Sequence, residues 1–574
     1  MEELLSIKQL DVVFQSEESR FQAVSNVSLN VHKGETVALV GESGSGKSVT
    51  SLSVLQLLPG SATFPNGQIL FRKKNGSPLN LLQATPAQLQ EVRGNEIAMI
   101  FQEPMTSLNP VFTCGQQVQE AIVQHQRCPA AAARRQTLEL FRQVQLPDPE
   151  QCMNRYPHQL SGGQKQRVMI AMAMSCNPSL LIADEPTTAL DVTVQKSVLH
   201  LMKQLQQHTG MGLLFITHDL GIVQEIADRV VVLYKGTIVE QGSTKDIFQH
   251  TQHPYTKALL ACRPVLHPKG QPLPVVEDFL QEKQVPVSDT NVTTGSTSHT
   301  TLQQIHEPLL SIRHLTVSFP AEKKFLGKPK KWIHAVQDVS FDIFPSETVG
   351  LVGESGCGKT TLGRTILRLQ EASSGSVLLS GKEILQQPLH TFQPHRRDLQ
   401  IVFQDPYSSL NPRIRIGAAI AEPMLVHGLA TNQRQAQARV VELLSKVDLP
   451  ADSINRYPHE FSGGQRQRLV IARALALEPK FIIWDESVSA LDVSVQAQVL
   501  NLLNQLKQEL GFTSLFISHD LSVVRYISDR ILVMHKGKVV ESGAAEEVWN
   551  HPQSDYTRQL LEAIPGKSYQ PFRN

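Results

Sequence analysis

The sequence has little cysteine for its length, and the cysteines that it has are scattered. Six occur in 574 residues, at positions 114, 128, 152, 176, 262 and 357, and no two form a Cys-x-x-Cys pair. Structural zinc sites use paired cysteines, and disulfide frameworks are typical of short secreted chains. The sequence therefore predicts reduced thiols, without a zinc site or a disulfide framework.

Long apolar runs and an excess of one charge are missing as well. No apolar run approaches the ~20 residues that span a bilayer. The first ten residues, MEELLSIKQL, lack the basic and apolar regions of a signal peptide. The net charge is +1, whereas a protein that binds nucleic acid by charge usually has a basic excess. We expect a cytosolic globular chain whose contact with a membrane, if any, is made through a partner.

The chain contains one pattern twice. GESGSGKS at positions 41–48 returns as GESGCGKT at 353–360, and RYPHQLSGGQKQR from Arg155 returns as RYPHEFSGGQRQR from Arg456. From Ser161 onward the two copies align at a constant offset of 301 residues. A period this long indicates a duplicated domain and not a solenoid. We predict domains at 1–263 and 309–574, joined by a flexible polar linker at 264–308.

Each copy has the pattern of an α/β domain with a mainly parallel sheet. The apolar run 36–40 precedes a loop of small residues, and residues 48–58 follow with helical spacing. Residues 180–183 and 213–217 are further candidates for buried strands. Between Pro104 and Cys176 the apolar spacing is mostly helical, which predicts a helical subdomain.

Both copies contain Gly-x-x-x-x-Gly-Lys-Ser/Thr, a pattern typical of phosphate binding. Its glycines let backbone N–H groups converge on phosphate oxygens at the start of a helix. The lysine reaches the β- and γ-phosphates, and the last hydroxyl lies on Mg²⁺. The loops consist of Gly41, Glu42, Ser43, Gly44, Ser45, Gly46, Lys47 and Ser48, and of Gly353, Glu354, Ser355, Gly356, Cys357, Gly358, Lys359 and Thr360.

A pair of carboxylates ends a candidate strand in each copy. Asp184 and Glu185 end LLIADE, and Asp485 and Glu486 end FIIWDE. The aspartate can hold Mg²⁺, and the glutamate can accept a proton from the attacking water as a general base. Alone, this pattern also fits a strand that ends in an acidic loop. Beside a phosphate loop it predicts a site that hydrolyses ATP, and both copies keep the glutamate.

Both copies resemble ATP-binding cassette (ABC) domains, because each also carries the signature Ser-Gly-Gly-Gln. The resemblance implies a P-loop core of the RecA type with a helical subdomain. It also implies that the two cassettes pair within the chain, so that each signature reaches the γ-phosphate bound by the other cassette. The signatures are Ser161, Gly162, Gly163 and Gln164, and Ser462, Gly463, Gly464 and Gln465. The first composite site joins Lys47, Asp184 and Glu185 to Ser462 and Gly464, and the second joins Lys359, Asp485 and Glu486 to Ser161 and Gly163.

The remaining family positions are matched too. Gln102 and Gln404 resemble the glutamine that senses Mg²⁺ and the γ-phosphate, and His218 and His519 resemble the switch histidine. Asp191 and Asp492, within Ala-Leu-Asp strings that begin at Ala189 and Ala490, resemble the D-loop. Phe14 and Phe319 are candidates for stacking on adenine, with the alternative that they are core phenylalanines of a strand.

The strings Ser-Leu-Asn-Pro, Arg-Tyr-Pro-His and His253-Pro254-Tyr255-Thr256 are similar to those of oligopeptide, dipeptide and nickel import ATPases. This resemblance implies two membrane permease subunits, an extracytoplasmic solute-binding protein and a place on the cytoplasmic face of the inner membrane. Peptides are the expected substrate, with glutathione and nickel left open. The alternative is a soluble tandem ABC ATPase acting on ribosomes or nucleic acid. The polar linker and the net charge of +1 favour the transporter.

Two expectations concern cysteine. Some peptide-import ATPases carry a cysteine cluster after the cassette, but only Cys262 stands there in the first copy, and the second copy has no cysteine after Cys357. An iron–sulfur cluster takes about four thiolates, so none is predicted. Cys357 stands in the second phosphate loop where the first copy has Ser45. Either a small residue simply fits there, or the lysine and the helix N-terminus make this thiol sensitive to alkylation.

Overall fold

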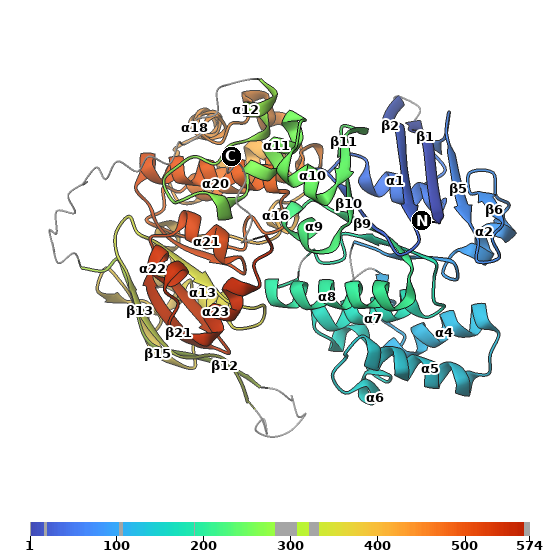
Figure 1. The fold of residues 1–574 in the computed structure, drawn as a ribbon. Coiled ribbons are helices and arrows are strands. Elements are labelled where there is room, and N and C mark those ends of the chain that lie inside the picture. Colours follow the sequence, from blue (N-terminus) through green and yellow to red (C-terminus); the bar gives the residue numbers. More distant parts are fainter. Residues whose placement is uncertain are drawn as a thin grey trace. The chain divides into compact units, whose positions relative to one another are not determined.

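The computed structural model describes residues 2–15, 20–102, 107–188, 190–281, 307–320 and 332–566. The chain divides into two compact units, residues 1–261 with 565–574, and residues 262–564. Each unit contains one copy of the repeat, and Figure 1 draws the first in blue to green and the second in yellow to red. Within the described residues, no helix is both long and apolar enough to span a bilayer.

The core of the first unit is a six-stranded sheet. Its strands lie in the order β11 (Thr237–Ser243), β10 (Arg229–Tyr234), β3 (Thr36–Val40), β9 (Gly212–Thr217), β8 (Leu180–Asp184) and β7 (Ile97–Ile100). All neighbouring pairs are parallel except β10 and β11. Every residue of β3, β8 and β9 is buried, as expected for strands that are covered on both faces. The predicted parallel core is therefore confirmed.

A second, antiparallel sheet in the same unit was not predicted. Its order is β2 (Arg20–His32), β1 (Glu3–Gln15), β5 (Gln68–Arg72) and β6 (Pro78–Asn80), and β4 (Ala62–Thr63) also pairs with β1. The register between β1 and β2 shifts at several points, so their apolar residues do not alternate regularly. Leu5, Ile7 and Val24 of this sheet share one buried cluster with Val37 and Leu39 of β3.

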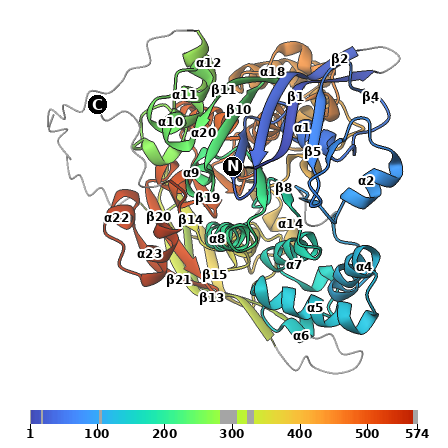
Figure 2. The same cartoon turned by 45° about the vertical axis from the view of Figure 1, so that its right-hand side comes forward.

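Helices complete the first unit. The core carries α1 (Lys47–Val54), α2 (Pro86–Val92), α8 (Val192–Thr209), α9 (Leu220–Ile226), α10 (Thr244–Gln249) and α11 (Pro254–Ala261). The predicted helical subdomain contains α4 (Cys114–Gln126), α5 (Ala130–Gln143), α6 (Pro149–Cys152), η1 (Pro157–Gln159) and α7 (Gly162–Met174). In Figures 1 and 2, α4, α5 and α6 lie together, away from β1 and β2. Pro104, the predicted start of this subdomain, lies outside the described residues.

The second unit repeats this design. Its core sheet has the order β17 (Leu399–Val402), β18 (Phe481–Asp485), β19 (Thr513–Ser518), β14 (Thr348–Val352), β20 (Arg530–His535) and β21 (Lys538–Ala544). The antiparallel sheet has the order β13 (Trp332–Ile343), β12 (Leu310–Pro320), β15 (Ser374–Leu379) and β16 (Lys382–Glu383). The helices of the cassette are α13 (Lys359–Ile366), α14 (Leu389–Phe392), α15 (His395–Asp398), α16 (Pro406–Ser409), α17 (Ile416–Val426), α18 (Gln433–Lys446), η3 (Ala451–Asn455), η4 (Pro458–Glu460), α19 (Gly463–Leu475), α20 (Val493–Leu510), α21 (Leu521–Ile527), α22 (Ala545–Asn550) and α23 (Asp555–Glu562).

Two features differ from the sequence-based expectation. The helix expected over 48–58 ends at Val54, and Gln56 has a left-handed backbone with φ of 52°. Within the flexible linker expected at 264–308, the described residues 264–281 contain η2 (Pro264–Leu266) and α12 (Val276–Leu280) and belong to the second unit. Residues 282–306 of the predicted linker lie outside the described residues, and the domain boundaries remain predictions.

A buried carboxylate ties the two sheets of the first unit together. Arg229 of β10 donates through one terminal nitrogen to Glu35 Oε1 (3.1 Å) and to Asn30 Oδ1 of β2 (3.1 Å). The backbone N–H of His32 donates to Glu35 Oε2 at 2.8 Å. Burial acts to raise the pKa of Glu35, but the hydrogen bonds from His32 and Arg229 outweigh it and hold the pKa below its usual value.

We predict that Glu35→Gln destabilises the first cassette in a pH-dependent way. The folded-state pKa lies below the unfolded-state value near 4.5, so the carboxylate stabilises the fold above that pH and loses this effect as the pH falls. At pH 7 the cost should be about 1–3 kcal/mol, and it should shrink toward pH 3. Thermal melts followed by circular dichroism at both pH values measure this. Glu120→Gln, at an exposed position of α4, is the control, and equal losses at pH 7 and pH 3 would contradict the prediction.

Candidate functional site

The two phosphate loops join the middle strand of each core sheet to the next helix. Gly46 and Gly358 immediately precede α1 and α13, with φ of 101° and 109°, in the left-handed region that favours glycine. A Cβ at Gly46 would lie 2.8 Å from the carbonyl oxygen of Ala23, and one at Gly358 would collide with that of Ala335. Glycine is thus required twice over, by the backbone angle and by the close approach of a neighbouring strand.

Each loop folds around its own lysine. Lys47 Nζ donates to the carbonyl oxygens of Gly41 (2.7 Å) and Glu42 (2.8 Å). Lys359 Nζ makes the same bonds to Gly353 (2.7 Å) and Glu354 (3.0 Å). Both lysines are buried, so these carbonyls supply polar contacts where water cannot reach. The positive charge is thereby fixed at the start of the helix, where an anionic phosphate would lie.

The predicted metal-binding aspartates face the hydroxyl groups that end the loops. Ser48 Oγ donates to Asp184 Oδ1 at 3.2 Å, and Thr360 Oγ1 donates to Asp485 Oδ1 at 2.9 Å. Burial raises the pKa of Asp184 to about 6, and it also raises that of Asp485. The neighbouring glutamate adds to both shifts, whereas the hydroxyl opposes them. Each site thus holds two adjacent oxygen ligands of the kind that Mg²⁺ prefers.

Three side chains from separate parts of the cassette contact the carboxylate of Glu185, the residue that follows Asp184. Glu185 Oε2 accepts from Gln102 Nε2 (3.1 Å) and Thr188 Oγ1 (3.0 Å), and Oε1 lies 3.1 Å from His218 Nδ1. Burial alone would raise the pKa of Glu185, but the His218 contact, Lys47 and Thr188 lower it to about 2. Its backbone φ is 46°, a left-handed value that is rare outside glycine and is often found at active sites.

The second site repeats this arrangement with a longer contact to its histidine. Gln404 Nε2 donates to Glu486 Oε2 at 3.0 Å, and His519 Nδ1 lies 3.6 Å from the same oxygen. Lys359 Nζ lies 3.8 Å from Glu486 Oε1, and the φ of Glu486 is 50°. Although burial would raise the pKa of Glu486, His519 and Lys359 hold it below its usual value. The structure thus brings together the predicted lysine, aspartate, glutamate, glutamine and histidine in both cassettes.

The two signatures begin helices α7 and α19. Ser161 and Ser462 are the N-caps, and each accepts a hydrogen bond from the backbone N–H of the glutamine three residues later. That glutamine accepts one in return from the serine N–H, at 3.1 Å in the first cassette and 3.0 Å in the second. Asp191 and Asp492 are likewise the N-cap residues of α8 and α20. Ala189 of the first D-loop lies outside the described residues.

Comparison with known proteins agrees with this geometry. The ABC transporter profile matches residues 24–188 and 336–489, which together make up more than half of the chain. The chain belongs to the ABC transporter family. A further profile, described as the oligopeptide/dipeptide transporter C-terminal region, matches residues 239–283.

Two relatives match this ABC protein over nearly its whole length. It is 48% identical to the glutathione import ATP-binding protein GsiA of Pectobacterium atrosepticum, over 98% of this chain and 89% of that protein. It is 49% identical to the protein of the same name from Salmonella choleraesuis, over 98% of this chain and 90% of the relative. The family predicted from the motifs is thereby confirmed, and ABC ATP-binding proteins are ATPases.

The sequence motifs did not indicate that each ABC phosphate loop is supported by a tyrosine, which is buried in the first cassette and partly buried in the second. The N–H of Glu42 donates to the hydroxyl of Tyr255 (2.9 Å), and that of Glu354 donates to Tyr556 (3.0 Å). Tyr255 lies against the ring of Tyr234, at 4.3 Å between centroids, and Tyr556 stacks on His535 at 4.0 Å. The string His-Pro-Tyr-Thr contains Tyr255, but its support of the phosphate loop is seen only from its contact with Glu42 in the folded chain.

Three other predicted residues are Phe14, Phe319 and Cys357. Phe14 and Phe319 are partly buried and pack against the core clusters of their cassettes, so their stacking on adenine remains a prediction. Cys357 is 7% exposed, and Ser45 at the matching position is 4% exposed. This agrees with the view that a small buried residue fits there, and the sensitivity of Cys357 to alkylation remains untested.

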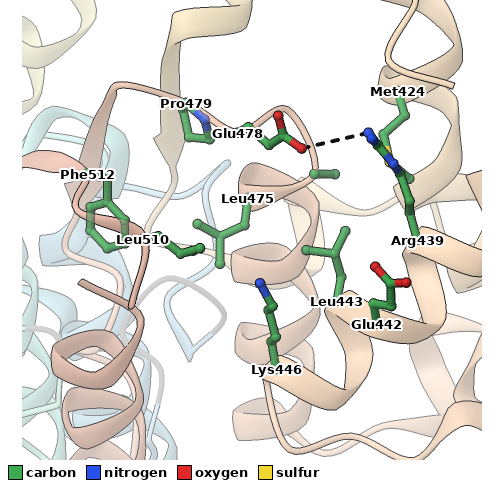
Figure 3. A pocket seen from close by; sticks show the side chains of 11 residues that line it. Met424, Arg439, Glu442, Leu443, Lys446, Leu475, Glu478, Pro479, Leu510 and Phe512 are labelled. Atoms are coloured by element: carbon green, nitrogen blue, oxygen red, sulfur yellow. Dashed lines mark ion pairs between the residues drawn. The ribbon is translucent and has the colours of Figure 1, made fainter. Parts of the chain in front are cut away.

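A separate cavity of about 340 Å³ lies in the second cassette, between α18 and the ends of α19 and α20 (Figure 3). Its apolar wall includes Leu443, Leu475 and Phe512, and an ion pair of 3.7 Å joins Arg439 to Glu478. No residue of the phosphate loop, the acidic pair or the signature lines it. This cavity is therefore distinct from the nucleotide site.

We predict that Tyr255→Phe weakens ATP binding at the first site. The variant leaves the buried Glu42 N–H without its acceptor, at a cost of about 1–3 kcal/mol. Affinity for ATP at that site should fall by about 5- to 100-fold. Binding of a fluorescent ATP analogue measures this, with Tyr556→Phe as the matched variant at the second site. Unchanged affinity at both sites would show that the tyrosines do not support the loops.

Proposed function

We propose that this chain is the ATP-hydrolysing subunit of an ABC importer that takes up peptides, including glutathione-like peptides. The observation that carries the proposal is the set of contacts on Glu185 and Glu486. Each glutamate is contacted by the glutamine and the histidine of its own cassette, beside the loop lysine and the aspartate. A complete hydrolytic set in both copies supports two active sites.

In this proposal the sites are composite and the two cassettes pair within one chain. Ser462 and Gly464 would complete the site of Lys47, and Ser161 and Gly163 would complete that of Lys359. The capped starts of α7 and α19 support this, because the first N–H groups of a helix suit an anionic phosphate. Covalent linkage raises the effective concentration of each cassette for the other.

The contacts of Glu185 describe a carboxylate that is ionised but weakly basic. With a pKa of about 2, it would be a poor acceptor for the proton of an attacking water near pH 7. Transfer of His218 from Glu185 to the γ-phosphate would remove the largest contribution that lowers this pKa. Hydrolysis then forms a bond from water oxygen to the γ-phosphorus and breaks the bridging P–O bond, and Glu185 accepts the water proton. ATP binding would thereby activate its own general base.

Mg²⁺ fits the donor set of both sites. Asp184 with Ser48, and Asp485 with Thr360, offer a carboxylate beside a hydroxyl. Gln102 and Gln404, whose amide nitrogens donate to Glu185 and Glu486, would each offer an amide oxygen. When bound, the ion would neutralise charge on the β- and γ-phosphates. The predicted absence of an iron–sulfur cluster remains a prediction.

The transport partners follow from the relatives and from an exposed apolar surface. Val111 and Phe112, after the glutamine loop, are 71% and 50% exposed, and Tyr407 in the second cassette is 64% exposed. Such side chains suit docking of a permease subunit. We infer two permeases, an extracytoplasmic solute-binding protein and a position on the cytoplasmic face of the inner membrane. The match to the oligopeptide/dipeptide transporter region and the relatives named for glutathione import support a peptide substrate over a ribosomal or nucleic-acid role.

We predict that Glu185→Gln and Glu486→Gln each reduce ATP turnover while ATP binding persists. Each single variant should hydrolyse less than half as much ATP as the wild type, and the double variant should lose about 10²–10³-fold, as expected when a general base is removed. Phosphate release and ATP-analogue binding measure the two properties. Glu120→Gln is the control, and near-wild-type turnover in either single variant would exclude that glutamate as the base.

We further predict that the chain purifies with integral membrane subunits. After mild detergent extraction, an affinity-tagged chain should retain two permeases, and Val111→Asp with Phe112→Asp should release at least one of them. Because both side chains are exposed, these substitutions should leave the melting temperature unchanged. Co-purification with ribosomes in place of membrane proteins would contradict the proposal.

A further inference from the structure

Residues 264–281, here called the strap, leave the first cassette and lie on the second. The strap contains η2 and α12, and it packs against α20 and α21. The side-chain amide of Asn501 pairs with the backbone of Leu273: Nδ2 donates to the carbonyl oxygen and Oδ1 accepts from the N–H, both at 2.8 Å. Leu273 itself is 2% exposed. These two hydrogen bonds from one side-chain amide fix the position of the Leu273 backbone on α20.

Two further contacts extend this anchor across the second cassette. The hydroxyl of Tyr526, a residue of α21 that is 1% exposed, lies 2.8 Å from the carbonyl oxygen of Gln271. It also lies 3.1 Å from Asn501 Oδ1, so one cluster joins the strap, α20 and α21. At the start of the strap, Lys269 pairs with Asp529, which also accepts from Lys507 of α20.

A third contact reaches the signature helix. Glu277 of α12 accepts from Gln498 Nε2 at 3.1 Å, and Gln498 Oε1 in turn accepts from Arg468 of α19 at 2.9 Å. The strap therefore connects, through side chains, to three helices of the second cassette. Each begins at an element of the ATP sites: α19 at Ser462, α20 at Asp492, and α21 one residue after the pair His519-Asp520.

The first cassette lacks three of the residues that hold the strap. At the constant offset of 301, Asn501 corresponds to His200, Tyr526 to Glu225 and Gln498 to Ser197. Arg167 donates directly to Ser197 at 2.8 Å, in place of the glutamine that links Arg468 to the strap. His200 and Glu225 are exposed. Asp529, in contrast, has an identical counterpart in Asp228, so the two copies differ in the Asn501, Tyr526 and Gln498 anchors and not in every partner of the strap.

We propose that the strap is an intrachain docking element that positions α20 and α21 of the second cassette, and with them Asp492 and His519, for ATP turnover. Asn501 and Tyr526 are positioning residues in this scheme, because they act through the strap and do not touch the nucleotide site. This inference rests on the proposed function of the second site as an ATPase. It assigns to residues 264–281, the segment that follows the first cassette, the role of keeping the second site competent.

The test frees the strap by two independent routes in the full chain. The first is the double variant Asn501→Ala with Tyr526→Phe, which removes the anchors on the cassette. The second is Lys269→Ala, which changes only the strap and leaves α20 and α21 intact, so a folding defect of the first variant does not decide the result. His200→Ala is the matched control at the corresponding position of the first cassette.

Hydrogen exchange and ATPase kinetics give the readouts. Exchange in residues 264–281 should rise about tenfold or more in the double variant and severalfold in Lys269→Ala, with faster exchange in residues 492–496 and 520–524. In a Glu185→Gln background, where the second site alone turns over, kcat should fall about three- to tenfold while KM for ATP changes less than twofold. His200→Ala should leave all of these unchanged.

Either of two results would overturn the proposal. One is a freed strap with unaltered kcat, which would make the docking purely structural. The other is unchanged exchange in both variants, which would show that these contacts do not hold the strap. Absence of ATP hydrolysis by the wild-type chain would instead refute the proposed function, and the exchange of residues 492–496 and 520–524 would still show whether the strap orders these helices.

Discussion

Each nucleotide site depends on the hydrogen bonding of one carboxylate. Glu185 follows the fully buried strand β8 and takes contacts from Gln102 after β7, from Thr188 before α8 and from His218 after β9. Displacement of any one of these segments would therefore change the charge environment of Glu185, the proposed general base. The left-handed backbone of Glu185 costs free energy, and the buried strand before it supplies the packing that holds it. This arrangement explains how movement between subdomains can be coupled to chemistry at a single oxygen.

The two cassettes keep the same chemistry but differ in its fine geometry. The distance from the histidine to the glutamate is 3.1 Å in the first cassette and 3.6 Å in the second, where Lys359 lies 3.8 Å from Glu486. Burial raises the pKa of the aspartate beside the phosphate loop in both cassettes, that of Asp184 to about 6. The copies thus differ less in their reacting groups than in the surfaces that surround them.

Much of the core and of the site could be predicted from the sequence, because these features are local in the chain. The apolar runs at 36–40 and 180–183 are strands, and the phosphate loop needs only eight consecutive residues. The antiparallel sheet escaped prediction because bulges interrupt the alternation of β1 and β2. Tyr255 and the strap escaped for another reason. Their partners are distant in sequence: Glu42 is 213 residues from Tyr255, and Asn501 is 228 residues from Leu273. No local pattern encodes such contacts.

The strap also bears on how this duplicated chain can evolve. Two identical cassettes could stand in either order along a polypeptide, because exchanging them would change no contact. Here, the segment that follows the first cassette is bound by Asn501 and Tyr526, for which the first cassette has only His200 and Glu225. An exchange of the two halves in the gene would therefore place the segment beside a surface that lacks the Asn501 and Tyr526 anchors. Duplication made the two domains alike, but the strap makes their order along the chain matter.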